Sequence, residues 1–137
     1  MARMKEMTDW LVDKLNEANL GKPVYKGPRS PIETSGAIFV VPVSDREDPY
    51  AIGDNFEEQW ELLIEVEIPY DDSEENIDEL FDLVDAIKDE LRELATRSIS
   101  ALNAREGRYG SVEYLLWSWK EKIYRAARIP VNWIGEQ

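Results

Sequence analysis

A change of hydrophobic period near residue 70 is the feature of this sequence that most constrains its fold. Apolar residues and glutamates alternate from Trp60 to Ile68, which predicts a β-strand with one packed face and one solvated face. From Asp72 or Ser73 the period becomes helical, because apolar residues recur at spacings of three and four. The resulting stripe is wide enough for the helix to cover a sheet. It consists of Ile77, Leu80, Phe81, Val84, Ile87, Leu91, Leu94 and Ala95.

The first third of the chain predicts another helix and another strand. A helix is predicted over about residues 3–18, ended by Gly21 and Pro23. Residues 21–36 are rich in Pro and Gly and predict a loop, in which residues 24–26 can form a short strand. Residues 36–43 predict a strand with both faces covered, where Pro42 marks an edge or the strand's end. The buried face of the predicted helix consists of Met4, Met7, Leu11, Leu15 and Ala18.

Two polar segments, residues 44–58 and 98–110, predict loops of a length that a compact domain seldom carries without a use. Residues 112–119 and about 124–134 predict an antiparallel pair of strands, joined around residues 120–123. The order is therefore helix, strand, strand, long helix, strand, strand. We predict a single α/β (α+β) domain over residues 1–137, with a mainly antiparallel four-stranded sheet, an N-terminal helix and a long helix packed across the sheet.

Composition limits the chemistry that this chain can perform. It has no Cys and no His, which removes disulfides, thiol nucleophiles, imidazole bases and almost every metal site with nitrogen or sulfur ligands. The formal net charge is -13, and residues 45–96 carry 20 acidic side chains against three basic ones. This excess opposes contacts with phosphate, so ordinary nucleic-acid binding is not expected. Without a signal peptide or a membrane-spanning segment, we expect a soluble protein made in a reducing compartment.

Acidic residues at the start of the long helix are the first candidates for a site. Asp71, Ser73 and Glu75 alternate like the oxygen ligands of a calcium loop. The glycine for the sharp turn is missing, however, and Asp82 stands where that loop needs a bidentate Glu. Helix capping explains more, because Asp72 as N-cap with Glu75 three residues later is a variant of the capping box. We predict no metal site, and a metal enzyme built on Asp71, Asp72 and Glu75 is the weakest alternative.

Glu61, Glu65 and Glu67 share the other face of the predicted strand. Glu65 and Glu67 stand two residues apart, as paired catalytic carboxylates do in some glycosidases and acid proteases. Catalysis would require one of them to be desolvated with a raised pKa, whereas the alternation places both on the polar face. We therefore expect a solvated strand face, no catalytic residue and no cofactor. Gly-rich phosphate loops and a nucleophile elbow are also missing from the sequence.

The last strands carry the candidates for a subunit interface. Trp117 and Trp119 share a strand face with Leu115, which predicts burial in the core or at a subunit contact and disfavours stacking on bases. Arg125 and Arg128 fall on opposite faces of a regular strand, so at least one should be free to meet a carboxylate. A basic block over residues 97–128 could attract the acidic block of another copy. Scattered charges on a solvated surface are the alternative.

Several segments of the chain resemble one protein family in their order. They are "MKEMTDWLVDKLNEA" as first helix, "GAIFVVPV" and "QWELLIEVEI" as middle strands, "SEENIDELFDLVDAIKDELREL" as covering helix and "YRAARIPVNW" as closing strand. This order resembles the tail terminator (tail completion, head-tail joining) proteins of long-tailed bacteriophages. In that family an N-terminal helix precedes a mainly antiparallel sheet that a second helix crosses. The segments 44–58 and 98–110 depart from the family's usual pattern.

The resemblance implies a virion structural protein, made in the host cytoplasm, that forms a hexameric ring without catalysis. Its partners would be copies of itself, the tail tube protein and the head connector or stopper protein, with no membrane involved. Phage DNA would pass through the ring without specific binding, and carboxylates lining the lumen would repel phosphate. Glu61, Glu65 and Glu67 are the candidates for that lining.

Two other functions stay open from the sequence. The chain could be another neck or head-tail joining protein of the virion. It could also be a small acidic binding protein, such as an immunity-type inhibitor or a DNA mimic, whose carboxylates engage a basic partner. A strict monomer that binds a basic enzyme tightly would favour the latter.

Overall fold

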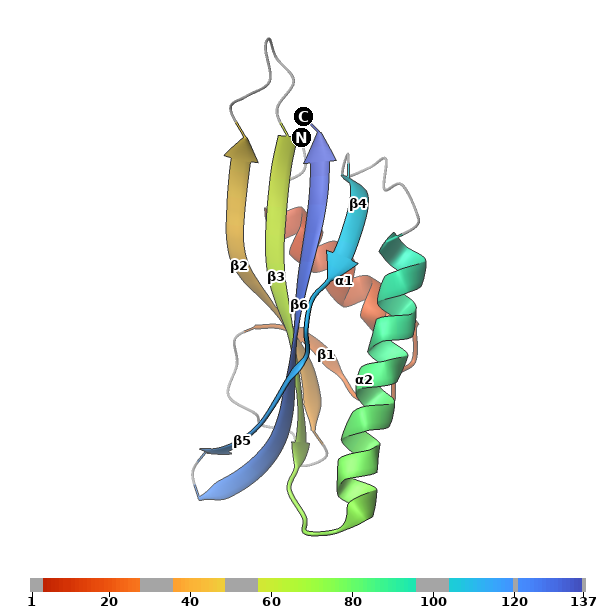
Figure 1. Ribbon diagram of the computed structural model, residues 1–137, viewed down its shortest axis with the longest axis vertical. Helices are drawn as coiled ribbons and strands as arrows, with labels where there is room; N and C mark the ends of the chain where they lie inside the picture. The colour runs from red at the N-terminus through yellow and green to blue at the C-terminus, as the bar shows by residue number, and fades with distance from the viewer. Residues whose placement is uncertain (1–3, 28–35, 49–56, 96–103, 120, 137) are drawn as a thin grey trace.

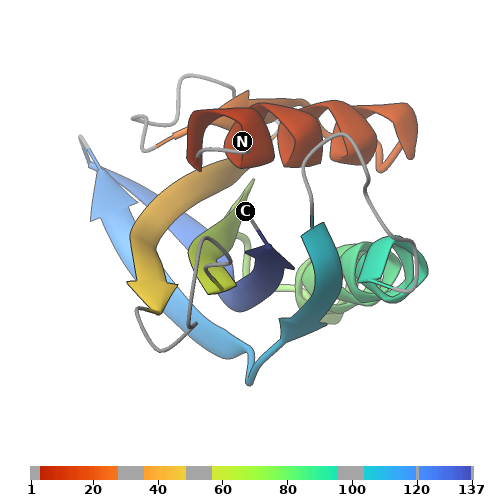
Figure 2. The same cartoon turned by 90° about the horizontal axis from the view of Figure 1, so that it is seen from above.

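The computed structural model describes residues 4–27, 36–48, 57–95, 104–119 and 121–136, with the backbone alone at positions 47, 48, 57, 58, 95, 104–106, 117, 119 and 136. These residues form α1 (Met4–Glu17), β1 (Val24–Lys26), β2 (Ala37–Asp48), β3 (Glu57–Pro69), α2 (Glu74–Ala95), β4 (Ala104–Tyr109), β5 (Glu113–Trp119) and β6 (Lys122–Glu136). The strands form one mixed sheet, and both helices pack on the same face of it (Figure 1; Figure 2). The predicted α+β class is confirmed. Neither of the two helices combines the length and the hydrophobicity that crossing a membrane requires.

The three longest strands form the centre of the sheet. β2 pairs with β3 and β3 with β6, both antiparallel, so that Phe39, Glu65 and Arg128 stand in one row. β1 extends the sheet beyond β2 as a short parallel strand. β4 and β5 occupy successive halves of the other edge of β6, both antiparallel to it. One face of the sheet carries the helices, and the opposite face carries the glutamates of β3.

The sheet has six strands where the sequence predicts four. β1 is the short strand allowed at residues 24–26. β4 lies within the predicted loop 98–110, so that prediction is wrong for residues 104–109. The sequence of β4, AREGRY, has no apolar alternation. Backbone pairing to β6 holds this strand, together with the packing of Tyr109 against the core. Gly107 is needed there for space, since a Cβ would lie 2.4 Å from Trp133 Cε2.

The predicted loop 44–58 is also too long. β2 continues to Asp48 and β3 begins at Glu57, while residues 49–56 lie outside the described part of the chain. The register between β2 and β3 shifts between Pro42 and Ser44, as at a β-bulge. β1 pairs with β2 only as far as Val40, so Pro42 follows the point where this neighbour ends. Pro42 therefore marks an edge, one of the two predicted alternatives.

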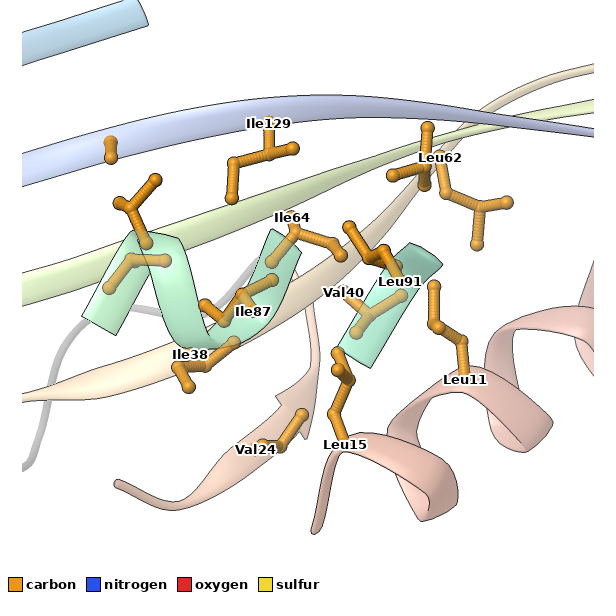
Figure 3. Close-up of a cluster of buried hydrophobic side chains, with 14 of the residues drawn as sticks. Leu11, Leu15, Val24, Ile38, Val40, Leu62, Ile64, Ile87, Leu91 and Ile129 are labelled. Carbon is orange, nitrogen blue, oxygen red and sulfur yellow. The ribbon is translucent and has the colours of Figure 1, made fainter. Parts of the chain in front are cut away.

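The core lies between the sheet and the two helices. The predicted packed face of β3 is confirmed, because Trp60, Leu62, Ile64, Val66 and Ile68 are each at most 1 % exposed. Side chains from both helices converge on this face (Figure 3). They include Met7, Leu11 and Leu15 of α1 and Leu80, Leu83, Val84, Ile87, Leu91 and Leu94 of α2. α1 thus buries Met7, Leu11 and Leu15 of its predicted face, whereas Met4 is partly buried and Ala18 lies beyond the end of the helix.

Candidate functional site

The acidic segment before α2 is a helix cap. Ser73 is the N-cap, because its Oγ accepts a hydrogen bond from the backbone N–H of Asn76 at 3.2 Å. The backbone N–H of Ser73 donates to Asp71 Oδ1 at 2.8 Å, and the Ser73 hydroxyl donates to the same oxygen. These bonds hold the pKa of the Asp71 carboxyl below its ordinary value. The prediction of Asp72 as N-cap is wrong, since Asp72 instead accepts a bond from the Tyr70 hydroxyl at 3.3 Å.

Arg125 ties β6 to the start of α2. Its Nε donates to Asn76 Oδ1 at 2.5 Å, and a terminal N–H donates to the carbonyl oxygen of Asp71 at 3.4 Å. The guanidinium carbon lies 4.7 Å from the centroid of the Tyr70 ring, within the range of a cation–π contact. Asn76 is itself buried. The Arg125 guanidinium is therefore already used within the subunit, which leaves Arg128 as the exposed arginine of the predicted interface pair.

Arg125 and Arg128 do lie on opposite faces of β6, as their spacing predicts. Arg125 is opposite Ile68 on the helix-covered face, whereas Arg128 is opposite Glu65 on the other. The Nε of Arg128 lies 3.2 Å from Glu65 Oε1, and its NH1 lies 4.0 Å from Glu113 Oε1. With 44 % of the arginine side chain exposed, these pairs lie at the surface and contribute little to stability.

The three glutamates of β3 share a face but have different environments. Glu61 is exposed and accepts a hydrogen bond from the Ser44 hydroxyl at 3.0 Å. Glu65 is partly exposed and paired with Arg128. Glu67 is only 5 % exposed, and its Oε2 has no hydrogen-bond partner among the described residues. The prediction that this strand face is solvated is therefore wrong at Glu67.

Burial raises the pKa of Glu67 to about 7, and the negative charge of Glu65 adds to the rise while Arg128 opposes it. Glu67 stands between Ala37 of β2 and Ala126 of β6, both buried. Its carboxyl is thus partly protonated near neutral pH. Of the pair Glu65 and Glu67, one carboxyl is therefore desolvated with a raised pKa, which is the condition for catalysis that the alternation of the sequence does not predict. Neither Glu65 nor Glu67, however, lines the two grooves of about 440 and 640 Å³ on either side of α2.

The side chains of Trp117 and Trp119 lie outside the described residues, so their burial stays a prediction. Their backbones pair with Tyr124 and Lys122 of β6. The backbone of Leu115 pairs with Ala126 of β6, two residues after Tyr124. Positions 115, 117 and 119 thus share the sheet face that carries the glutamates of β3, in agreement with the shared strand face that the sequence predicts.

An apolar groove of about 440 Å³ lies between α2 and β5, lined mainly by Ile77, Leu80, Phe81, Tyr114 and Leu116. The rings of Phe81 and Tyr114 meet edge to face, with centroids 5.3 Å apart. The helical period assigns Phe81 to the packed stripe, whereas 44 % of it is exposed, so this part of the prediction is wrong. The one signal in the sequence is the apolar run at residues 114–117, which places apolar residues on both faces of β5 although β5 is an edge strand.

A second groove, of about 640 Å³, separates the segment after α1 from α2. The carboxylates of Glu75, Asp78 and Asp82 line it, and Lys22 Nζ lies 3.2 Å from Glu79 Oε1. Within the described ranges, no group of three or more acidic side chains is placed to hold a metal ion. The acidic cluster is thus a charged surface partly offset by Lys22.

A scan against protein-family models finds no match for this chain, and a search of curated proteins finds no relative. The geometry and charge of its own side chains are therefore the basis on which a function can be assigned.

Proposed function

We propose that this chain is a structural subunit of a bacteriophage virion that assembles head to tail into a hexameric ring, the tail terminator that caps the tail tube and meets the head connector. The observation that carries the proposal is the division of the surface into unlike parts. α2 carries eight exposed acidic side chains, whereas three of the five large apolar side chains exposed among the described residues cluster beside β5. A closed ring with such subunits requires one surface to meet a different surface of the next copy.

The arrangement of the elements supports the same proposal. An N-terminal helix, an antiparallel centre of the sheet and a long helix between β3 and the last strands are the features on which the resemblance to tail terminators rests. The four strands that the sequence predicts would correspond to β2, β3, β6 and the edge formed by β4 and β5. β1 is then an addition at the opposite edge.

The negative charge suits a ring through which DNA must pass without binding. The chain carries a formal net charge of -13, which repels phosphate. Of the three proposed lumen residues, Glu61 is the exposed one. The charge of Glu65 is offset by Arg128, and burial raises the pKa of Glu67 to about 7. Glu61 is therefore the first of the three to test in a lumen.

Sedimentation velocity and negative-stain electron microscopy of the purified chain over rising concentration test the proposal. We expect rings with sixfold symmetry, formed alone at high concentration or on the ends of assembled tail tubes. A chain that stays monomeric at the highest soluble concentration and leaves tail-tube ends uncapped would overturn the proposal.

A second candidate, a small acidic inhibitor or DNA mimic, is favoured by one observation. The acidic side chains of α2 form a continuous charged face over most of its 22 residues. A basic enzyme or DNA-binding protein could dock on that face. A monomer that forms a tight one-to-one complex with such a partner, and no ring, would support this candidate over the first.

A further inference from the structure

The groove between α2 and β5 has the character of a docking surface. Phe81, Tyr114 and Leu116 are 44 %, 47 % and 55 % exposed, and they lie together around the same hollow. A cluster of this kind on a soluble domain marks an interaction site more often than scattered apolar residues do. The edge-to-face contact between Phe81 and Tyr114 fixes both rings at the mouth of the groove. Side chains held in place before binding lose little conformational entropy when a partner docks.

The groove is bordered by negative charge. Asp85 of α2 is the exposed carboxylate on this side, whereas Asp78 and Asp82 line the second groove, between α2 and the segment after α1. Asp85 lies close enough to Tyr114 to contribute to a raised pKa of its phenol, for which burial is the larger cause. The groove's own cation, Arg125, is already bonded to Asn76. An occupant with an apolar side chain and a neighbouring cation would therefore match both the hollow and its rim.

This chain carries such a segment. Besides the three groove residues, two large apolar side chains are exposed among the described residues, Val43 and Ile123. Val43 has an acidic residue two positions on, Asp45, whereas Ile123 directly follows the exposed Lys122. Ile123 lies near the turn of the β5–β6 hairpin, at 50 % exposure, and this turn projects away from α2 (Figure 1).

A copy cannot place its own hairpin turn in its own groove. Ile123 is opposite Ser118 on β5. This pair lies on the same face as the pair of Leu116 and Arg125, two residues further along the hairpin towards its turn. Regular pairing of the hairpin keeps Ile123 at that distance along the sheet. The matching segment and the groove can therefore meet only between two copies.

We propose that the β5–β6 turn of one copy, with Ile123 and Lys122, docks into the α2–β5 groove of the next copy. This inference rests on the proposed ring, for which it names the contact between subunits. Ile123 packs against Phe81, Tyr114 and Leu116, and Lys122 faces the carboxylate of Asp85 on α2. The turn and the groove are different surfaces, so the contact is head to tail.

Three substitutions and a mixing experiment test this contact. Leu116→Asp damages the groove, Ile123→Asp damages the turn, and Val43→Asp is a matched control at an exposed apolar residue of β2. Leu116→Asp and Ile123→Asp alone should each raise the dissociation constant at least about tenfold by sedimentation, whereas Val43→Asp should assemble like the wild type. Circular dichroism melting curves establish that each variant is folded.

The mixture discriminates the direction of the contact. A Leu116→Asp chain keeps an intact turn, and an Ile123→Asp chain keeps an intact groove. Mixed together, they should form a one-to-one heterodimer that cannot grow further, because the remaining turn and groove are both damaged. Mass photometry or light scattering would detect this species.

The outcomes separate this inference from the proposed function. If the Leu116→Asp and Ile123→Asp variants both form rings as the wild type does, the proposed contact is wrong, whereas the proposed ring is still supported. If the wild type forms dimers or open chains but no ring, and both variants fail to form them, the contact is supported and the tail-terminator function is overturned. A wild type that never self-associates would overturn both.

Discussion

A chain without histidine ordinarily has no side chain that titrates between about pH 5 and pH 8. In this protein Glu67 titrates in that range, because burial between β2 and β6 disfavours its charged form and raises its pKa to about 7. Its neighbour Glu65 is paired with the Arg128 guanidinium, so two carboxylates on one strand face have different surroundings. Ionisation of Glu67 therefore destabilises the folded state.

Replacing Glu67 with Gln should remove the pH dependence that this carboxyl gives to folding. Its pKa is about 7 in the folded protein against an ordinary value of 4.5, so the folded state binds the proton more tightly. Stability should therefore fall as the pH rises from about 4.5 to about 7 and stay level above that. Across this window the wild type should lose roughly 3 kcal/mol relative to Glu67→Gln, as urea denaturation at several pH values would measure.

Glu61→Gln is the matched control, because Glu61 lies on the same strand face and is exposed. It should leave the pH dependence of the wild type unchanged. Equal slopes for the wild type and Glu67→Gln would contradict a buried carboxyl that titrates near neutral pH.

At the scale of elements, the connection from β3 to α2 is held from three sides. Ser73 caps the helix, Asn76 bonds the backbone of the connection, and Arg125 reaches it from β6. The Asn76 amide oxygen accepts from both the backbone N–H of Asp71 and the Arg125 guanidinium. The start of the long helix is thus fixed by tertiary contacts as well as by its cap.

Ser73→Ala should destabilise the protein by about 1 kcal/mol, because it removes the oxygen that accepts the Asn76 N–H. Asp72→Ala, one residue earlier, should cost no more than a few tenths of a kcal/mol, since Asp72 is exposed and only bonds the Tyr70 hydroxyl. Thermal or urea unfolding of the two variants would measure the difference. A larger loss of unfolding free energy for Asp72→Ala would show that Asp72, and not Ser73, is the N-cap.

The two arginines of β6 should differ in what they contribute to stability. Arg125→Ala should cost about 2 kcal/mol, because it removes a charged hydrogen bond to a buried amide and a cation–π contact. Arg128→Ala should cost less than about 1 kcal/mol, since its ion pairs lie at the surface. Urea denaturation tests both, and a similar loss for the two variants would show that Arg125 does not hold the start of α2.

At the scale of the whole molecule, both helices cover one face of the sheet (Figure 2). Charge is unevenly spread over the surface. The layer of α2 is acidic, and the exposed cations Lys122 and Arg128 lie on β6. Contacts between copies would therefore combine opposite charges with the apolar groove beside β5.

Association of the wild type should weaken as salt rises. Going from about 0.1 M to about 1 M salt shortens the screening length from about 10 Å to about 3 Å, which removes most of the attraction between exposed charges. Lys122→Glu should associate more weakly than the wild type at low salt and respond less to added salt. Sedimentation equilibrium measures both, and association that strengthens with salt would show that screening of the repulsion between net-negative copies outweighs any loss of attraction at Lys122.

Prediction from the sequence was best where a signal is local. The period of residues 60–68 gave the buried face of β3, and the helical spacing gave the two helices to within a few residues. β4 escaped prediction, because a strand held by backbone pairing at an edge needs no apolar alternation. Phe81 was misplaced, since a helical stripe does not show where the sheet beneath it ends.

The sequence by itself determined the α+β class, the packed face of β3 and the acidic start of α2, because periodicity and capping depend on neighbours along the chain. Only the tertiary structure decided that Glu67 is buried, that Arg125 is used inside the subunit and that Phe81 lies beside Tyr114. Each of these depends on which residues from distant segments come to lie opposite one another. Local spacing places a side chain on a face, whereas the pairing of strands and the packing of helices determine what covers that face.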